Sequence, residues 1–186
     1  MIRTMTLFSL FIAAMMGLCA SPVLAHSAQA ETPSEAPSST TRPITQPITQ
    51  GVNHIGLTVT DLDASVAFFV DGLGWRTAGG FPDYPSVFVT DGSVFVTLWR
   101  ASDPANAISF DRKNNVGLHH LAFTVPDIET LDELHTKMAD WPGVTIEFSP
   151  EPNGGGPTIH MILREPSGNR LEFAVPGGRS RAQAKK

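Results

Sequence analysis

The sequence has one cysteine, Cys19, in 186 residues. Cys19 lies in an N-terminal segment that we expect to be removed, so the mature chain has no thiol. Disulfide bonds, cysteine nucleophiles and cysteine-based zinc sites are therefore excluded. Positive charge is also scarce, because 13 Lys and Arg residues stand against 18 Asp and Glu residues and leave a net charge of −5. This balance argues against a nucleic-acid partner.

Long apolar runs are scarce too, and the one from Leu7 to Leu18 is too short to span a bilayer. Arg3 precedes it, and small-residue cleavage sequences follow it, ending at Ala25 and Ala30. This order is typical of a secretory signal peptide, with an uncleaved anchor as the alternative. We predict that residues 1–30 are a signal peptide cut after Ala25 or Ala30. The protein is then periplasmic or secreted, without a stable membrane anchor.

Composition divides the rest of the chain into three parts. Residues 31–50 are rich in Pro, Ser and Thr and lack apolar periodicity, which is typical of a linker. Residues 177–186 begin with two glycines and are basic, which predicts a disordered tail. The folded domain is expected over residues 51–176.

This domain contains an internal repeat. The segment from Val52 to Leu62 reappears from Leu118 to Ile128, so that His54 corresponds to His120. The same spacing relates Val59 to Val125, Asp61 to Asp127 and Trp75 to Trp141. Each unit has an apolar strand face to bury, so pairing the units predicts a common core with a pocket between them.

Periodicity predicts a βαβββ order in each module. For the module at 51–100 we expect a strand over 52–60, a helix capped by Asp61 or Asp63, and strands near 75–77, 86–90 and 93–99. For the module at 117–176 we expect a strand over 117–125, a helix over 128–139, and strands over 144–148, 158–163 and 170–175. The predicted fold class is α+β, with paired βαβββ modules forming a cupped, partly closed mixed sheet and helices on the outside.

Three segments carry a family resemblance: His54-Ile55-Gly56-Leu57-Thr58-Val59, His120-Leu121-Ala122-Phe123, and Glu165-Pro166-Ser167-Gly168-Asn169-Arg170-Leu171-Glu172-Phe173. Together they resemble the vicinal oxygen chelate superfamily, which includes glyoxalase I, methylmalonyl-CoA epimerase, extradiol dioxygenases and the fosfomycin and bleomycin resistance proteins. The resemblance covers residues 51–176. It implies a divalent metal ion held in the cup.

In that family, the metal ligands come from the first and last strands of each module. The resemblance implies His54, His120 and Glu172 as ligands and places Thr97 at the fourth position. Because Thr is a poor metal ligand, the remaining two-His, one-carboxylate set favours Fe(II) or Mn(II), with Zn(II) or Ni(II) possible.

The resemblance to ring-cleaving dioxygenases is less complete. Where those enzymes carry an additional Tyr and His, this chain has Ile162 and Asn153. Strand alternation places His160 on the same face as Ile162, so His160 is the candidate general acid or base, with a pocket-lining role as the alternative. The same alternation directs His119 away from the pocket.

Further residues are expected to line the pocket. Phe95 and Trp99 share the face of Thr97 and provide an apolar wall for a small organic substrate. Arg170 shares the face of Glu172, where it either pairs with that carboxylate or holds an anionic substrate group. The glycine-rich loop at 153–156 is expected to be a lid.

The leading hypothesis is an exported glyoxalase-like metalloenzyme in which the metal chelates vicinal oxygens for lyase or isomerase proton transfer, as in a lactoylglutathione lyase. Thr97 disfavours glyoxalase I itself. The alternatives are a dioxygenase with a two-His, one-carboxylate site and a non-enzymatic small-molecule binding protein of the resistance type. Whether the cup closes within one chain or across a homodimer is left open.

Overall fold

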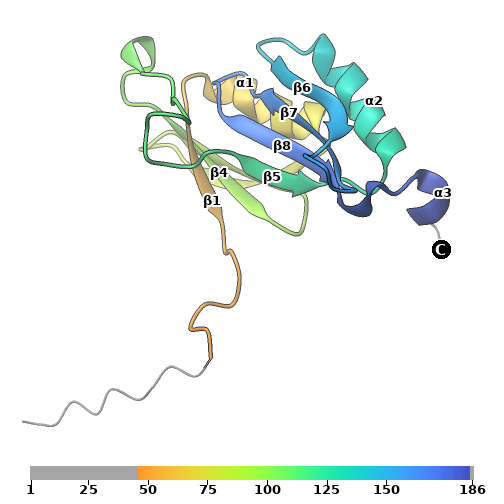
Figure 1. Ribbon diagram of the computed structural model, residues 1–186. Coiled ribbons are helices and arrows are strands. Elements are labelled where there is room, and N and C mark those ends of the chain that lie inside the picture. The colour runs from red at the N-terminus through yellow and green to blue at the C-terminus, as the bar shows by residue number, and fades with distance from the viewer. Residues whose placement is uncertain (1–45, 185–186) are drawn as a thin grey trace, which may run out of the picture. The chain divides into compact units, whose positions relative to one another are not determined.

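The computed structural model describes residues 46–184 (Figure 1). The predicted signal peptide and most of the linker lie outside the described residues. Residues 46–50 are exposed and have no helix or strand. In the described part of the chain, no helix has the length and apolar character needed to cross a membrane.

The first module contains one sheet and one helix. Its elements are β1 (Ile55–Val59), α1 (Leu62–Ala67), a π-helical continuation η1 (Phe68–Gly72), β2 (Arg76–Phe81), β3 (Ser86–Thr90) and β4 (Phe95–Arg100). The strand order is β1-β4-β3-β2, which we call sheet A. β1 runs parallel to β4, and the other pairs are antiparallel.

The second module repeats this topology. After a short 3-10 turn η2 (Pro104–Asn106) come β5 (Leu121–Thr124), α2 (Ile128–Ala139), β6 (Thr145–Pro152), β7 (Ile159–Arg164) and β8 (Arg170–Val175). The order β5-β8-β7-β6 forms sheet B, again with one parallel pair. The predicted α+β fold of paired βαβββ modules is confirmed, and the two sheets do not close into a barrel.

The repeat is visible in the helix caps. The Asp61 carboxylate accepts a hydrogen bond from the Ala64 amide at 3.0 Å, and the Asp127 carboxylate accepts one from the Thr130 amide at 2.8 Å. Each bond satisfies an N–H group that the first helical turn leaves without a partner. Both helices therefore begin at the same point of the repeat.

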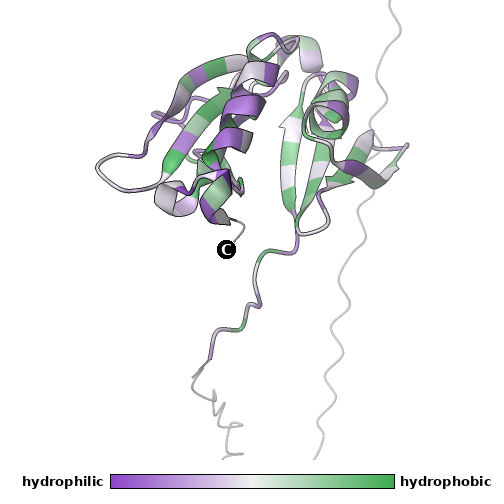
Figure 2. Ribbon diagram, turned by 90° about the vertical axis from the view of Figure 1, so that its right-hand side faces the viewer, coloured by the Kyte–Doolittle hydropathy of each residue, from purple (hydrophilic) through white to green (hydrophobic). Residues whose placement is uncertain are grey.

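The core lies between the helices and one face of each sheet. Buried side chains from both modules form a single cluster, which includes Leu57, Val59, Phe68, Phe69, Leu98, Leu131, Met138, Leu171 and Phe173. In Figure 2 hydrophobic colour follows the strands, whereas α2 is largely hydrophilic on its outer side. One face of each sheet is thus covered, and the opposite face is left for the site.

Two sets of contacts join the modules. The Trp75 and Phe123 rings meet edge to face with centroids 5.2 Å apart, and Lys137 Nζ donates to the carbonyl oxygens of Asp71 and Gly72 at 2.7 Å each. A Cβ atom on Gly72 would lie 3.2 Å from Met138 Cε, so glycine allows α2 to approach η1 closely. These contacts fix the packing of the first module against α2.

The second set comes from the turn between β7 and β8. Ser65 Oγ donates to the buried Glu165 carboxylate at 2.7 Å, and the Thr60 amide donates to Ser167 Oγ at 3.0 Å. Asn169 Nδ2 also donates to the Thr58 carbonyl oxygen at 3.0 Å. The start of β8 is therefore tied to the end of β1, which positions the site residues of sheet B relative to sheet A.

The sequence predicted a disordered tail over residues 177–186, of which the structure describes residues as far as 184. A short turn η3 (Pro176–Gly178) leads into helix α3 (Arg181–Ala184). The Ile128 amide donates to the Arg179 carbonyl oxygen at 3.0 Å, and Arg181 forms an ion pair with Glu133 at 2.8 Å. Arg181 thus has an acidic partner on the first half of α2.

Candidate functional site

The site on sheet B is built around Glu172. In the antiparallel pair of β7 and β8, His160 lies opposite Ala174 and Ile162 opposite Glu172, so His160 and Glu172 share one face. His160 Nδ1 lies 2.6 Å from Glu172 Oε1. The structure therefore brings together two of the site residues that sequence alternation placed on one face.

His120 approaches the same carboxylate from the other side. It immediately precedes β5, whose Ala122 lies beside Glu172 in the parallel pair. His120 Nε2 lies 3.0 Å from Glu172 Oε2. The Glu172 side chain is only 8% exposed, whereas that of His120 is 35% exposed. A buried carboxylate thus lies between two imidazoles, one of which is open to solvent.

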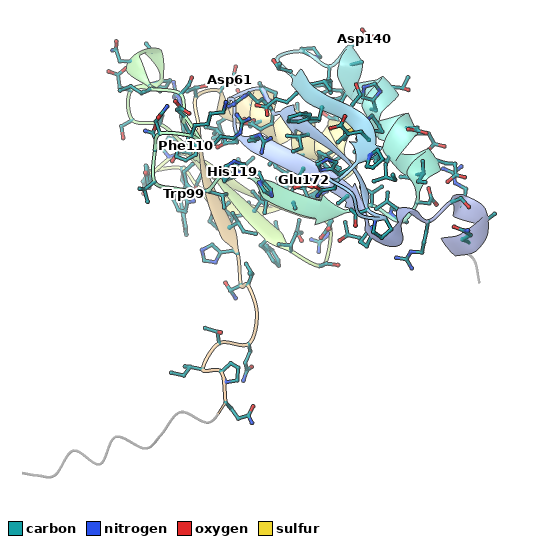
Figure 3. The ribbon with its side chains drawn as sticks, viewed as in Figure 1. Asp61, Trp99, Phe110, His119, Asp140 and Glu172 are labelled. Carbon is teal, nitrogen blue, oxygen red and sulfur yellow. The ribbon has the colours of Figure 1, made fainter. Side chains whose placement is uncertain are left out.

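His119 was expected to face away from the pocket, but it belongs to this group. Its Nδ1 atom lies 2.8 Å from His120 Nδ1, and Figure 3 shows it near Glu172. Burial lowers the pKa of His119, and the positive charge of Arg170 lowers it further. The prediction was wrong because β5 begins only at Leu121, so strand alternation does not extend back to residue 119.

Asn153 also reaches the carboxylate. Its Nδ2 atom lies 3.5 Å from Glu172 Oε1, at the long limit of a hydrogen bond. β6 extends to Pro152, further than the expected 144–148, so the glycine-rich loop starts next to the site. Asn153 is thus the one residue of this loop that contacts Glu172, whereas the two glycines that follow it are surrounded by open space.

His54 lies apart from this group. It precedes β1 on sheet A, is exposed, and places Nδ1 2.8 Å from Asn53 Oδ1. Over residues 46–184, no group of three or more His, Cys, Asp or Glu side chains is arranged to hold a metal ion. His120 and Glu172 fit two ligands of such a site, but within one chain the predicted set of three is not assembled.

The open face of sheet A is aromatic. Tyr84 and Phe88 place their ring centroids 5.0 and 5.8 Å from that of Trp99, and the Phe81 ring lies 5.4 Å from the Phe88 ring. Phe81 and Tyr84 are each 55% exposed, and Phe95 is 42% exposed. The sequence prediction named only Phe95 and Trp99. Alternation along β3 could have found Phe88, because it lies opposite Thr97.

Thr97 is buried on this face. It accepts a hydrogen bond from Trp99 Nε1 at 2.9 Å and donates to the Ile55 carbonyl oxygen at 3.4 Å. A Cβ atom on Gly56 would lie 3.4 Å from Thr97 Oγ1. Because the Thr97 hydroxyl group accepts the hydrogen bond from Trp99 Nε1, it holds the Trp99 ring in place.

Arg170 pairs with Glu147, not with Glu172. Its Nε atom lies 2.6 Å from Glu147 Oε2, and Arg164 Nε lies 2.8 Å from Glu147 Oε1. Burial alone would raise the pKa of Glu147, but the hydrogen bond from Arg170 and the charges of Arg170 and Arg164 hold it below its usual value. Glu147 was not predicted, because nothing in the sequence pairs β6 with Arg170 across β7.

A cavity of about 300 Å³ adjoins Arg170. It lies between β1, the turn before β8 and the connection between the modules. Its polar lining includes Thr58, Ser109 and Asn169, its apolar lining includes Phe110 and Leu118, and Arg170 is the one charged residue that lines it. Figure 3 shows Phe110 and Trp99 on the same side of the molecule as His119.

Comparison with solved structures identifies several similar folds. A glyoxylase/bleomycin resistance protein/dioxygenase domain from Frankia sp. EAN1pec is 26% identical, with a TM-score of 0.58 over 72% of this chain and 95% of its own. A lactoylglutathione lyase from Agrobacterium tumefaciens is 23% identical, with a TM-score of 0.52 over 70% and 97%. A fosfomycin resistance protein from Listeria monocytogenes is 18% identical, with a TM-score of 0.56 over 70% and 94%.

The last two identities are low enough that they show a shared fold alone. No curated protein sequence matches the chain. The family model described as the Glyoxalase/Bleomycin resistance protein/Dioxygenase superfamily matches residues 51–173, which is nearly the whole folded region. The chain belongs to this superfamily.

Proposed function

We propose that this protein is an exported metalloenzyme of the glyoxalase-like kind, which binds a small organic substrate through two neighbouring oxygens and catalyses lyase or isomerase proton transfer. The observation that carries the proposal is the buried Glu172 carboxylate held between His120 and His160. Members of this superfamily commonly use divalent metals, and histidine with carboxylate is a donor set suited to such ions.

The proposed metal ligands are His54, His120 and Glu172, with Fe(II) or Mn(II) favoured. When bound, the ion supplies Lewis acidity that polarises the chelated oxygens of the substrate. Glu172 is well prepared to be a ligand, because the contact with His160 orients its carboxylate. Zn(II) and Ni(II) remain compatible with these donors.

The split ligand set leads us to propose a homodimer. Within one chain, His54 immediately precedes β1 of sheet A, whereas His120 immediately precedes β5 and Glu172 lies on β8 of sheet B. The open face of sheet A exposes Phe81, Tyr84 and Phe95, a larger apolar surface than scattered single residues would give. Packing sheet A of one copy over sheet B of a second copy would cover these rings and bring His54 to the other two ligands.

His160 is the proposed proton carrier. Because Nδ1 lies against the Glu172 carboxylate, the N–H of the neutral ring is at Nδ1 and donates to Oε1. The Nε2 lone pair is then free to take a proton from a substrate held on the same face. The contact also holds the ring in one orientation, as in other histidine bases supported by a carboxylate.

Complementation between two variants tests the shared site. His54→Ala and His120→Ala should each reduce metal content by about tenfold or more, the size expected for a lost ligand. Mixing equal amounts of the two variants under conditions that exchange subunits should restore about a quarter of the wild-type metal content, because about half of the dimers are then mixed and each mixed dimer keeps one complete ligand set of its two. No recovery in a verified mixed dimer would contradict the shared site, and unchanged metal content in both single variants would contradict the ligand assignment.

A binding protein without catalysis is the second candidate. It is favoured by the observation that one chain does not assemble the predicted ligands, while its open faces and cavity can still hold a small molecule. Ligand binding before and after treatment with a chelator decides between the two candidates. A resistance-type binding protein should bind its ligand equally well after the metal is removed. Oxygen consumption with catechols would instead identify the dioxygenase chemistry that the two-His, one-carboxylate donor set also allows.

A further inference from the structure

On the open face of sheet B, two guanidinium groups share a single carboxylate. Arg164 and Arg170 share one carboxylate, Glu147, and the charge of Arg112 is near enough to lower the pKa of Glu147 as well. Glu172 and Glu151, which lies opposite His160, are further carboxylates on this face, and neither forms an ion pair with an arginine among the described residues. The shared Glu147 leaves a local excess of positive charge at Arg164 and Arg170, beside the proposed active-site carboxylate.

Arg170 is the residue best placed to use this charge. Its side chain is only 7% exposed, and Nε is occupied by Glu147. The two Nη groups have no hydrogen-bond partner among the described residues. In that part of the chain, every fully buried polar side-chain atom has a partner, so the Nη groups are not fully buried. The Nη groups therefore reach accessible space, and a largely buried charge gains most from an anionic partner.

The cavity beside Arg170 suits the rest of such a ligand. Its volume of about 300 Å³ is at the small end for ligand pockets, and Phe110 and Leu118 provide apolar contact. Arg170 and Glu172 lie on the same face two residues apart on β8, a rise of roughly 7 Å. Arg170 thus lines the cavity and also shares a face with Glu172.

We propose that this face binds the carboxylate of a small organic acid, with Arg170 as the main contact, Arg164 and Arg112 adding charge, and the cavity holding the apolar remainder. The inference rests on the proposed function in that it names the substrate class of the same site. A monoanion would balance the second of the two arginines that share Glu147, and the planar guanidinium matches a carboxylate.

Benzoate and its neutral isostere benzamide are suitable probes. Binding is measured by ligand-detected NMR on the full mature protein after chelator treatment, so that neither metal nor turnover is required. Benzoate should bind at least tenfold more tightly than benzamide. Arg170→Gln should weaken benzoate by about tenfold or more and leave benzamide unchanged, because a charge-assisted hydrogen bond is lost. Arg76→Gln, an exposed position on sheet A, is the matched control.

Equal binding of the two probes would overturn the proposal, as would wild-type benzoate affinity in a folded Arg170→Gln variant. If Arg170→Gln fails to fold, the benzoate affinity of Arg112→Gln tests the proposal instead. That residue is partly exposed in the connection between the modules, and its replacement should weaken benzoate about threefold, whereas no change would overturn the proposal. Because the assay is metal-free, failure here leaves the metal-content test untouched, and the two proposals can fail separately.

Discussion

At the residue scale, the arrangement around Glu172 shows how far strand alternation can predict a site. Alternation placed His160 and Glu172 on one face, and they are in contact. It failed for His119, because that residue precedes its strand. It placed Arg170 on the face of Glu172 but could not identify its partner Glu147, which lies two strands away on β6. Neighbours within a strand pair can therefore be predicted from sequence, whereas contacts of long side chains across a sheet cannot.

His160 gives the residue-scale prediction. His160→Ala should leave the metal bound and reduce turnover by roughly a hundredfold or more, the usual size of a general acid or base contribution. The assay begins with a screen of thioesters, 2-oxoaldehyde adducts and catechols, and metal is measured on the same samples. His135→Ala on α2, outside the site, serves as control. Full activity in the variant would reduce His160 to a pocket-lining residue, and loss of metal would make it a ligand.

At the element scale, the sequence predicted the order of strands and helices more accurately than their ends. α2, β3 and β8 have the predicted bounds, because capping residues and turns mark them. β1 and β5 are shorter than predicted, since each is an edge strand whose first residues have no partner strand to pair with. That shortening leaves His54 and His120 outside regular strands, where their direction could not be predicted.

The arginine pair on sheet B gives a prediction about acid stability. Because the pKa of Glu147 is lowered in the folded protein, its charge stabilises the fold above the ordinary carboxyl pKa of about 4.3. This contribution is lost as the pH falls through the folded value. Glu147→Gln should therefore lower the melting temperature near pH 7 and make it less sensitive to acidification below about pH 4.5. Melting curves parallel to wild type would contradict this, and Glu151→Gln, exposed on β6, is the control.

At the scale of the whole molecule, the repeat predicted two equal modules, and the structure has them. The repeat also predicted one cup shared by the two modules. It did not determine whether the open faces of sheets A and B meet within one chain or between two copies. The modules are joined by Trp75 with Phe123 and by the turn around Ser167, and these contacts leave both open faces free. Sequence repetition cannot distinguish a cup within a chain from one between chains, because both bury the same residues.

Metal content of the purified mature protein is the measurement that tests the central claim most directly. The account predicts close to one divalent ion per chain in the wild type. It also predicts a loss of about tenfold or more in His54→Ala and in His120→Ala, although the two histidines lie on different sheets. A wild-type protein that binds no ion when loaded with Fe(II), Mn(II), Zn(II) or Ni(II) would contradict it, as would metal content unchanged in both variants.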